Sequence, residues 1–512
     1  MIDLKQLREN PDRFRAGAKA KKIEVDIDAL LELDTRKRAL MAEQESKRAE
    51  QNKISKEIGP QIGKLRGSLK KASDTERPGV EAEIKILEEK PSRLKAEIQG
   101  LDQQIAEIDP RLNELLLKVP LPPDPDVPAG ESENDNVELR TWNPDWFDPK
   151  KSFRENKGFD PKSHIDLIRD LKLVDFERAV KIAGARHYVF TGDGMRLQQA
   201  VLRFAFDFVT NEHGFTPMSV PVIVREECMV GTGFFPTGRD QAYCVSNLSG
   251  FDMKVGHRDQ PVSSTRVQIK QDGERIAVEH TTSYPSEADA TPDTNTGYRP
   301  LDGWLTGTGE VGLMGLHADE IIDADQLPLQ YATVSTCFRR EAGAAGKDTA
   351  GLYRVHQFDK VEQVVICRAD EAESRAWHKK MIGIVEELMQ KLELPYRLLQ
   401  CCTADLGPKN ADMIDIEGWM PSRGDVDANG IPQGAYGETH SASRLYDYQC
   451  RRLNLRYRGE NGKTVFCHSL NNTVAATPRI LIPILEMYQN EDGSVTVPEV
   501  LRAYMGGRER IG

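Results

Sequence analysis

The stretch FRREAGAAGKDTAGLYRVHQFDKVEQ, residues 338–363, is the most unusual segment of the chain. It joins two apolar runs, TVSTCF (333–338) and KVEQVVI (360–366), which predict strands, so a long mobile hairpin is expected between them. Four residues at the strand ends are candidate ligand groups: Arg339, Glu341, Phe358 and Glu362. They offer an anion clamp, two hydrogen-bond acceptors and an aromatic face. An exposed charged hairpin without a ligand has the same composition, so this segment alone does not decide the function.

A second group of candidate ligands lies downstream, in GETHSASRLYDYQCRRLNLRY (437–457) and LNNTVAATPRILIPILE (470–486). Glu438 and Ser441 carry oxygen ligands of the kind that Mg²⁺ uses beside triphosphate oxygens. Arg479 stands at the start of an apolar helix, where the helix dipole disfavours its charge. This mismatch favours phosphate binding over a plain surface charge.

The common nucleotide-binding and hydrolase motifs are missing from the sequence. There is no GxxxxGK[ST] loop, no GxGxxG opening a helix, no nucleophile elbow and no HExxH. The chemistry that remains is phosphate chemistry, in which arginines and a carboxylate-bound metal position the reactants and stabilise charge.

The first 120 residues have a helical period. Apolar residues recur at steps of three and four in a heptad seam: Val80, Ile84, Leu87, Pro91, Leu94, Ile98, Leu101, Ile105, Ile108, Leu112 and Leu115. A similar repeat precedes it: Ile54, Ile58, Ile62, Leu65 and Leu69. The polar segment KKASDTERPG (70–79) separates the two repeats, so we predict an antiparallel coiled-coil hairpin with its tip near residues 73–77.

Three prolines interrupt these helices, and proline bends a helix because it removes a hydrogen bond. Measured from a tip at Thr75, Pro60 and Pro91 are equally far along the two helices. We therefore predict a shared kink about 23 Å from the tip, with the two prolines facing each other. Pro110 falls near the base of the hairpin, where a break matters less.

The charge of the chain is unevenly distributed. Its 512 residues carry a net charge of -12, yet residues 1–120 sum to about +2 and residues 47–77 to about +5. No apolar run reaches the length of a membrane span, and the charged N-terminus does not resemble a signal peptide, so a cytoplasmic protein without membrane contact is expected. The eight scattered cysteines include no CxxC pair, so neither disulfides nor a structural zinc site are expected.

Composition divides the chain into three parts: a helical arm over 1–118, a linker over 119–164 that begins with VPLPPDPDVPAGESENDN, and an α+β domain over 165–512. Within the last part, TRVQIKQDGERIAVEH (265–280) alternates on both sides of Asp272-Gly273, which predicts a β-hairpin.

The chain resembles the bacterial-type seryl-tRNA synthetases over nearly its whole length. MIDLKQLRENPDRF (1–14) opens like that family, GFTPMSVPVIV (214–224) resembles its motif 1, residues 338–363 resemble its motif 2, and residues 470–486 resemble its motif 3. The resemblance implies a class II catalytic domain built on a mixed, mainly antiparallel sheet with flanking helices, together with a coiled-coil arm that binds tRNA. It also implies a homodimer formed through the motif 1 region.

The resemblance assigns roles to individual residues. Arg339 and Arg479 would be catalytic, because they hold the α-phosphate and the γ-phosphate. The positions expected around ATP are Arg339, Arg340, Glu341, Val355, Phe358, Glu438, Thr439, His440, Ser441 and Arg479. The positions expected around serine are Thr308, Gly309, Glu310, Arg339, Glu362, Asn471 and Thr473. Glu438 and Ser441 would bind Mg²⁺.

The implied reaction is the activation of L-serine with ATP to seryl-adenylate, followed by transfer to the 3' end of tRNA(Ser), and of tRNA(Sec) where that tRNA is present. Two alternatives stay open. A related ligase could load a small amino acid onto a carrier protein, although the long basic arm argues against it. A silent RNA-binding regulator would have no need for Arg339, Glu362, Glu438 and Arg479.

The chain departs from the family pattern in several places. An insertion at about 246–302 replaces a short connection, and it could be a surface hairpin, a lid or a partner-binding surface. Arg444 replaces a common asparagine and Asp412 a common lysine. His440 could tune the metal site from behind, or it could be a tolerated core side chain.

Overall fold

The structure is a computed structural model that describes residues 1–73, 76–245, 252–255, 263–272, 275–283, 303–342, 350–459 and 462–512. The chain forms two compact units, one of residues 1–136 with 402–411 and one of residues 137–401 with 412–512. Among the described helices, none has both the length and the apolar composition that a membrane crossing requires.

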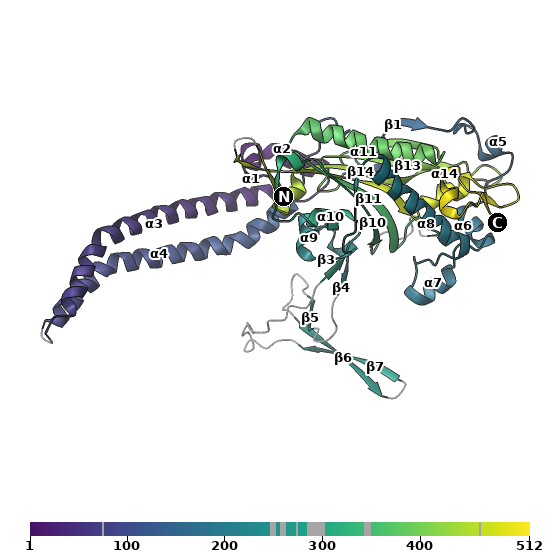
Figure 1. Cartoon of the computed structure of the whole chain (residues 1–512). Coiled ribbons are helices and arrows are strands. Elements are labelled where there is room, and N and C mark those ends of the chain that lie inside the picture. Colours follow the sequence, from purple (N-terminus) through teal and green to yellow (C-terminus); the bar gives the residue numbers. More distant parts are fainter. Residues whose placement is uncertain are drawn as a thin grey trace. The chain divides into compact units, whose positions relative to one another are not determined.

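The first unit is helical. Its main elements are α1 (Leu4–Glu9), α2 (Pro11–Ala20), α3 (Ile27–Leu69) and α4 (Arg77–Lys118), and α3 and α4 form the long hairpin in Figure 1. The side chains of Asp3, Asn10 and Asp26 accept hydrogen bonds from backbone N–H groups in the first turns of α1, α2 and α3. These caps explain why three separate helices begin where they do.

The predicted coiled-coil hairpin is confirmed. The residues between the seam positions of α4 are mostly exposed, while the seam is buried at Ile84, Leu94, Ile98, Leu101, Ile108, Leu112 and Leu115. Ion pairs cross between the helices beside this seam: Lys37–Asp109, Lys47–Glu97, Arg48–Asp102, Glu50–Lys90 and Arg66–Glu88. Exposed pairs of this kind contribute little stability, so the apolar seam carries the association of α3 with α4.

Both helices of the hairpin bend in its distal part, as predicted (Figure 1). The prolines do not face each other, however, and that part of the prediction was wrong. Gln51 Nε2 lies 3.4 Å from the carbonyl oxygen of Pro91, so Pro60 is closer to the tip. The reason is that α3 ends at Leu69 and α4 begins at Arg77, which centres the turn before Thr75 and shifts the pairing of the helices.

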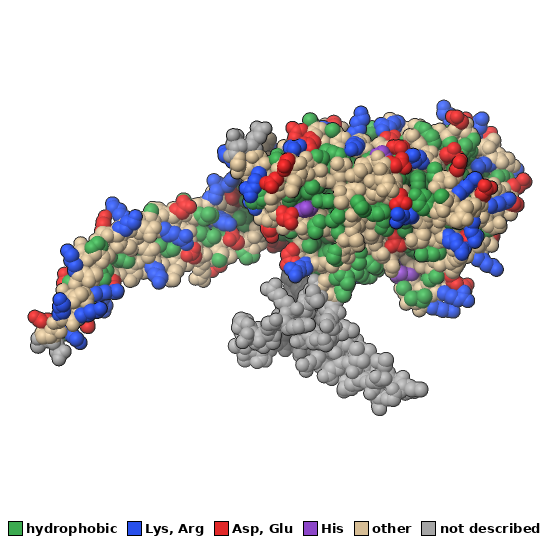
Figure 2. Space-filling view, viewed as in Figure 1, with side chains coloured by type: hydrophobic (Ala, Val, Ile, Leu, Met, Phe, Trp, Pro, Cys, Tyr) green, Lys and Arg blue, Asp and Glu red, His purple; other side chains and the backbone are tan. Residues whose placement is uncertain are grey.

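Lysine and arginine side chains gather over the distal part of the hairpin (Figure 2). Among the described residues, the exposed basic residues of this part are Lys53, Lys56, Lys64, Arg66, Lys70, Lys71, Arg77, Lys85 and Lys90. At the other end of the unit, buried Lys21 donates to the carbonyl oxygens of Gly407 and Asn410, which attaches residues 402–411 to the N-terminal helices. Burial lowers the pKa of Lys21 to about 7.

The second unit is built on an eight-stranded sheet of order β1-β12-β13-β14-β17-β11-β10-β2. Its strands are β1 (Val137–Trp142), β2 (Thr216–Met218), β10 (Leu329–Phe338), β11 (Gln357–Cys367), β12 (Tyr396–Gln400), β13 (Asp412–Met420), β14 (Ala435–Tyr446) and β17 (His468–Thr477). All neighbours are antiparallel except β10 and β2, so the sheet is mixed and mainly antiparallel, as predicted.

The described residues of the second unit form ten α-helices beside its sheets: α5 (Phe153–Lys157), α6 (His164–Asp170), α7 (Phe176–Ala183), α8 (Gly192–Asp207), α9 (Glu226–Gly231), α10 (Glu310–Gly315), α11 (Glu371–Lys391), α12 (Tyr448–Arg452), α13 (Leu481–Met487) and α14 (Glu499–Arg502). The apolar sides of α8 and α11 share one core with Val361, Val365 and Val474 of β11 and β17. A second core contains Val364 and Ile366. Strand β11 is therefore buried on both faces, which explains its continuous apolar run.

The segment expected as a linker contributes to both units. Residues up to Asn136 belong to the first unit, and β1, which pairs with β12, already belongs to the second. Farther on, β3 (Ile223–Arg225), β4 (Tyr243–Val245) and β8 (Gly303–Leu305) form a small sheet, and residues 246–302 lie between β4 and β8 in the sequence. In that insertion β5 (Asp252–Val255), β6 (Ser263–Asp272) and β7 (Arg275–Ser283) pair, and the predicted hairpin residue Gly273 lies outside the described residues.

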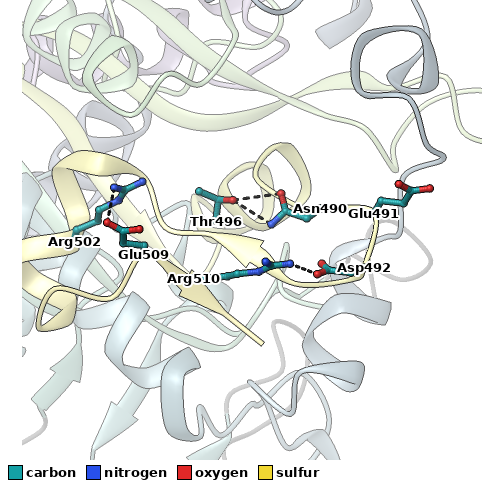
Figure 3. A pocket seen from close by; sticks show the side chains of 7 residues that line it. All are labelled: Asn490, Glu491, Asp492, Thr496, Arg502, Glu509 and Arg510. Carbon is teal, nitrogen blue, oxygen red and sulfur yellow. Dashed lines mark hydrogen bonds and ion pairs between the residues drawn. The ribbon is translucent and has the colours of Figure 1, made fainter.

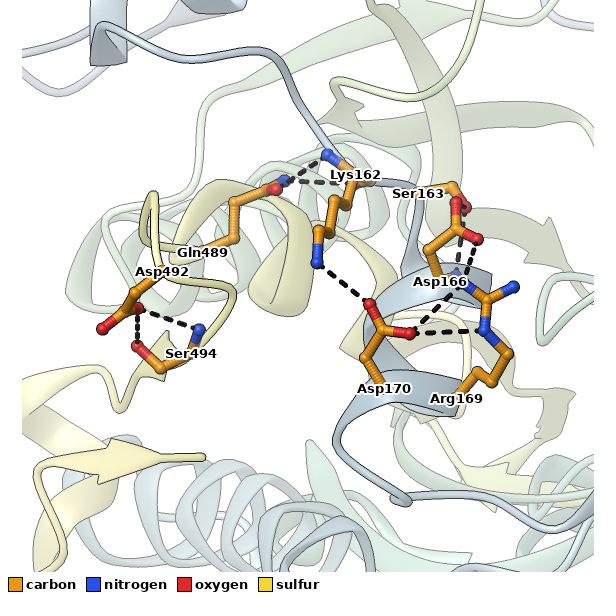
Figure 4. A network of polar contacts seen from close by, with 8 residues as sticks. All are labelled: Lys162, Ser163, Asp166, Arg169, Asp170, Gln489, Asp492 and Ser494. Atoms are coloured by element: carbon orange, nitrogen blue, oxygen red, sulfur yellow. Dashed lines mark hydrogen bonds and ion pairs between the residues drawn. The ribbon is translucent and has the colours of Figure 1, made fainter.

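Three further short strands complete the second unit's small sheets: β9 (Ile321–Asp323), β15 (Arg456–Arg458) and β16 (Thr464–Phe466). A two-stranded piece, β18 (Val495–Thr496) with β19 (Arg510–Ile511), ends the chain. Polar contacts hold α6 beside this C-terminal region (Figure 4). Lys162 Nζ lies 2.9 Å from Asp170, and the Gln489 side chain bonds the backbone of Lys162 on both its N–H and its carbonyl oxygen.

Candidate active site

The candidate residues lie on the face of the sheet that is turned away from α11. Gln363 and Asn472 donate from the other face to the carbonyl oxygen of Met381 on α11. Side chains alternate along a strand, so Glu362 on β11 and Asn471 on β17 point the opposite way. The register places Thr473 directly across from Glu362.

Glu362 is the centre of a buried polar cluster. Its Oε2 accepts a hydrogen bond of 3.1 Å from Thr308 Oγ1, and its Oε1 one of 3.3 Å from Asn471 Nδ2. Lys360 forms an ion pair with the same carboxylate. The side chain of Glu362 is 1% exposed, so these contacts replace water around its charge.

Gly309 and Glu310, the two residues that follow Thr308, are held by close packing and by a hydrogen bond. A Cβ atom on Gly309 would lie 2.4 Å from a methyl carbon of Thr333 and 3.0 Å from Ser335 Oγ, so only glycine fits beside β10. Buried Glu310 accepts a 2.7 Å bond from Gln449 Nε2, and Ser469 donates to the other end of that amide. This chain of hydrogen bonds fixes the carboxylate of Glu310, which supports a structural role for Glu310 in the pocket.

Two polar atoms beside Glu362 have no hydrogen-bond partner among the described residues. They are Asn471 Oδ1, next to the carboxylate, and Thr333 Oγ1, on the residue paired with Glu362 across β10 and β11. Buried polar atoms are nearly always satisfied in folded proteins. Such atoms are therefore the groups that a polar ligand would pair with.

The start of the motif 2 loop presents two exposed arginines. The guanidinium carbon of Arg339 lies 5.3 Å from the centre of the Phe358 ring, within cation–π range, and Arg340 is exposed beside it. Glu341 has a φ of 48°, a left-handed conformation, and Arg354 lies 2.9 Å from its carboxylate. A strained backbone at a ligand-binding position is common, because surrounding contacts can hold it there. The expected mobile part of this hairpin, residues 343–349, lies outside the described residues.

Gln241 provides such contacts, and sequence reasoning missed it. Its carbonyl oxygen accepts from the Arg340 N–H at 2.9 Å, its Oε1 accepts from the Ala342 N–H at 3.0 Å, and its Nε2 donates to the Ala342 carbonyl at 3.0 Å. Both neighbours of Glu341 are therefore fixed by one residue. No local pattern around Gln241 indicates this, because the contact joins residues 100 positions apart.

A β-bulge brings Glu438 and Ser441 to the same face of β14. The two residues are an odd number of positions apart, so a regular strand would point them in opposite directions. The register shifts between Ile416↔His440 and Glu417↔Glu438, which makes Thr439 the extra residue and restores the common face. A carboxylate and a hydroxyl thus lie together, and such oxygens fit Mg²⁺.

Arg479 is held beside Glu438. Its Nη1 lies 3.2 Å from Glu438 Oε1, its Nε donates to the Tyr353 carbonyl at 3.3 Å, and its guanidinium stacks 4.5 Å from the Tyr353 ring centre. Burial acts against its charge, but Glu438 and other nearby anionic groups outweigh that effect and raise the pKa of Arg479. Tyr353, which also stacks against Arg423, was not predicted as a site residue.

Three other expected ATP-site residues have buried side chains. Val355 is 5% exposed. Thr439 Oγ1 donates to the Ile416 carbonyl at 2.9 Å and lies 2.8 Å from His440 Nδ1. Burial lowers the pKa of His440 to about 3, so its imidazole is neutral. Of the two interpretations of His440, the structure favours a core side chain.

Two of the departures from the family pattern contact each other. Asp412 and Arg444 are directly opposed on β13 and β14, and their side chains form a buried ion pair of 3.0 Å. His378 of α11 and Gln400 also contact Asp412. The pair therefore lies under α11, on the face opposite Glu362, and it is a coupled change within the core.

Figure 3 shows a surface hollow near the C-terminus, lined by Asn490, Glu491, Asp492, Thr496, Arg502, Glu509 and Arg510. Its arginines are already engaged: Arg510 pairs with Asp492 and Arg502 with Glu509. Asn490 bonds Thr496. Both arginines of this hollow are paired with carboxylates, so neither is left to bind an anion, and none of the candidate residues lines it.

Known proteins match both units. Residues 302–488 match the tRNA synthetase class II core domain (G, H, P, S and T), which includes every candidate site residue, and residues 1–122 match the seryl-tRNA synthetase N-terminal domain. The sheet that carries these arginines and carboxylates is accordingly that of a class II aminoacyl-tRNA synthetase.

The full-length relatives narrow the class to one family. The chain is 38% identical to the serine–tRNA ligase of Deinococcus radiodurans, covering 100% of this chain and 99% of the relative, and 35% identical to that of Maricaulis maris over the whole of both. The crystal structure of the Pyrococcus horikoshii seryl-tRNA synthetase complexed with ATP matches with a TM-score of 0.70 at 33% identity, over 100% of this chain and 99% of that one. The chain belongs to the seryl-tRNA synthetase family.

Proposed function

We propose that the chain activates L-serine with ATP and transfers the serine to the 3' end of tRNA(Ser). The observation that carries this proposal is the buried Glu362 cluster, in which Asn471 Oδ1 has no hydrogen-bond partner among the described residues. Glu362 pairs across the sheet with Thr333 of β10, the strand that leads to Arg339. A small zwitterion with a hydroxyl group suits such a pocket. The cytoplasm, which supplies ATP and tRNA, is the proposed location.

The residues bind and orient the reactants rather than attack them. The serine carboxylate attacks the α-phosphorus of ATP, which gives seryl-adenylate and pyrophosphate. The 3'-hydroxyl of the tRNA then attacks the activated carbonyl and releases AMP. Arg339 would hold the carboxylate and the α-phosphate, and Arg479 the γ-phosphate, so that positive charge meets the charge that develops on phosphate oxygens.

Mg²⁺ fits the pair Glu438 and Ser441, because the bulge gives them a common face and both offer oxygen ligands. Bound there, the ion would neutralise charge on the phosphates of ATP. Arg479, 3.2 Å from Glu438, keeps that carboxylate oriented.

Serine-dependent exchange of pyrophosphate into ATP tests the first step, with alanine, glycine and threonine as controls. We expect exchange with serine and much less with the other three. Exchange with none of the four amino acids would refute the enzyme function. Exchange with alanine or glycine but not serine would support the carrier-protein ligase instead.

The basic distal arm is the proposed binding surface for tRNA, since clustered Lys and Arg neutralise a phosphate backbone. We also propose a homodimer through the motif 1 region. Large apolar side chains are exposed at Ile223, within this region, and at Val334 of β10, the strand that pairs with β2 of the same region. Light scattering should give twice the mass of one chain, and Val334→Glu should shift the protein toward monomer.

A further inference from the structure

Lys360 is a buried charged residue for which the proposed chemistry has no use. It stands on β11 two residues before Glu362, so both side chains point to the same face of the sheet. Its side chain is only 7% exposed. An ammonium group in that position is unfavourable unless it is paired, which calls for an explanation.

The contacts of Lys360 form a closed triangle. Its Nζ donates to Thr308 Oγ1 at 2.9 Å, and it forms an ion pair with Glu362 Oε2. Thr308 Oγ1 in turn donates to the same Oε2 at 3.1 Å. The hydroxyl thus accepts from one partner and donates to the other, and a single orientation satisfies all three groups.

These three contacts determine which hydrogen-bond acceptor positions of Glu362 remain for a ligand. An ionised carboxylate has about four acceptor positions, two on each oxygen. Lys360 and Thr308 occupy Oε2, while Asn471 occupies one position of Oε1 at 3.3 Å. One position on Oε1 is left by these contacts, and beside it lies Asn471 Oδ1, which has no hydrogen-bond partner in the part of the chain that the structure describes.

We propose that Lys360 is the positioning and specificity-determining residue of the serine pocket. Its ammonium group balances the charge of Glu362 and fixes Oε2, so that the substrate meets one acceptor on Oε1. A hydroxyl donor satisfies that acceptor, whereas alanine leaves it unpaired and is rejected. This inference rests on the proposed function, because it concerns the amino acid that the same pocket binds.

Lys360→Met tests the proposal, because it removes the charge and keeps an unbranched side chain. We expect the KM for serine in pyrophosphate exchange to rise about 30-fold or more, since breaking a buried pair leaves an uncompensated charge. The preference for serine over alanine in kcat/KM should fall at least about 10-fold, while the KM for ATP stays within about twofold. Lys379→Met, on the exposed side of α11, is the matched control and should behave like the wild type.

A second comparison separates positioning from a general structural role. With Glu362→Gln already in place, adding Lys360→Met should change serine binding little, because the two residues act as one unit. Additive effects in this cycle would overturn the proposal, as would unchanged serine preference or equal losses for serine and ATP. A lower KM for serine would also overturn it, because it would mean that Lys360 competes with the substrate.

Lys360→Gln replaces Lys360→Met in both comparisons if the methionine variant does not fold, and Lys360→Arg should retain more of the serine preference than either. Measurements on the wild-type enzyme distinguish a failure of the proposed role of Lys360 from a failure of the proposed function. If it exchanges pyrophosphate with serine but the Lys360 variants keep its preference, only the role of Lys360 is refuted. If the wild type exchanges with no amino acid, the proposed function fails.

Discussion

At the scale of single residues, Arg479 illustrates how the neighbours of a functional side chain decide its geometry. Tyr353 fixes it twice, by a backbone hydrogen bond of 3.3 Å and by its ring, and Glu438 fixes it from the other side. Arginine presents a planar fork that lysine cannot reproduce.

Replacing Arg479 by alanine should lower kcat/KM for ATP in pyrophosphate exchange by about 100-fold or more, because a charge contact to the transition state is lost. Arg479→Lys should recover only part of this loss, since it keeps the charge without the fork. Tyr353→Ala should cause a smaller loss, of about 10-fold, by freeing the guanidinium. An Arg479→Ala enzyme with wild-type exchange would exclude this arginine from the reaction.

Gln241 supports a second prediction at this scale. Because its side chain fixes Ala342, the residue after the strained Glu341, Gln241→Ala should raise the KM for ATP by about 5- to 10-fold and leave the KM for serine nearly unchanged. Gln241→Glu keeps an acceptor for the Ala342 N–H but loses the donor, so it should fall between alanine and wild type. Steady-state exchange at varied ATP and serine measures both constants. Equal changes in the two would argue against a role confined to the ATP loop.

At the scale of elements, the paired strands β13 and β14 bury the carboxyl group of Asp412, and neighbouring side chains set its pKa. Burial raises the pKa of Asp412, but the hydrogen bond and charge of His378, together with Arg444 and Gln400, outweigh it and lower the pKa to about 2. The unfolded value is 3.8. A carboxyl group with a lowered pKa in the folded state stabilises the protein above its unfolded pKa, and that stability is lost as pH falls toward the folded pKa.

The free energy of unfolding should therefore decrease as the pH falls from about 5 to about 2. The wild type should lose about 2 kcal/mol more than Asp412→Asn as the pH falls across this range, because only the wild type must protonate a paired Asp412. Urea unfolding at a series of pH values measures the difference. Asp145→Asn removes an exposed carboxylate and is the control, expected to run parallel to the wild type. Parallel curves for Asp412→Asn would contradict the lowered pKa.

The α3–α4 hairpin is an element whose role can be tested by shortening it. Lys37 and Asp109 face each other at 2.6 Å, so residues 40–106 can be replaced by a turn of about four glycine and serine residues without separating the helix bases. We expect serine-dependent exchange to persist and charging of tRNA to collapse. Both reactions are measured on one preparation, so a folding defect would appear in the exchange assay. Equal loss of both would show that the arm has another role.

At the scale of the whole molecule, periodic features were predictable from sequence. The heptad seam predicted α4 down to individual buried residues such as Ile98 and Leu112, because coiled-coil contacts repeat locally. The apolar runs on either side of the motif 2 loop predicted β10 and β11 in the same way. The predicted class of fold is confirmed by the family matches.

The features that sequence did not reveal depend on contacts between distant segments. In the sequence, Lys360 looks like any charged residue of a strand, and only the folded structure shows Thr308 beside it. The sequence around Gln241 contains no pattern that indicates its contact with the motif 2 loop. The bulge at Thr439 is a further case, since strict alternation would separate Glu438 from Ser441. The level pairing of Pro60 and Pro91 was wrong because the exact turn position sets the register of two long helices.

The net charge of -12 over the chain would suggest weak interaction with RNA, but binding depends on the local charge that the RNA meets. If tRNA binds the distal arm, its affinity must fall steeply with salt, because bound Lys and Arg release counterions from phosphates. Replacing Lys64, Lys70 and Lys71 by glutamine should make the slope of log kcat/KM for tRNA against log salt less negative by about 2. The same replacement at Lys150, Lys181 and Lys379, exposed lysines of the second unit, is the control and should leave the slope unchanged. Pyrophosphate exchange should show no such difference in either variant, because it requires no contact with RNA. An unchanged slope in the arm variant would place the phosphate contacts elsewhere on the molecule.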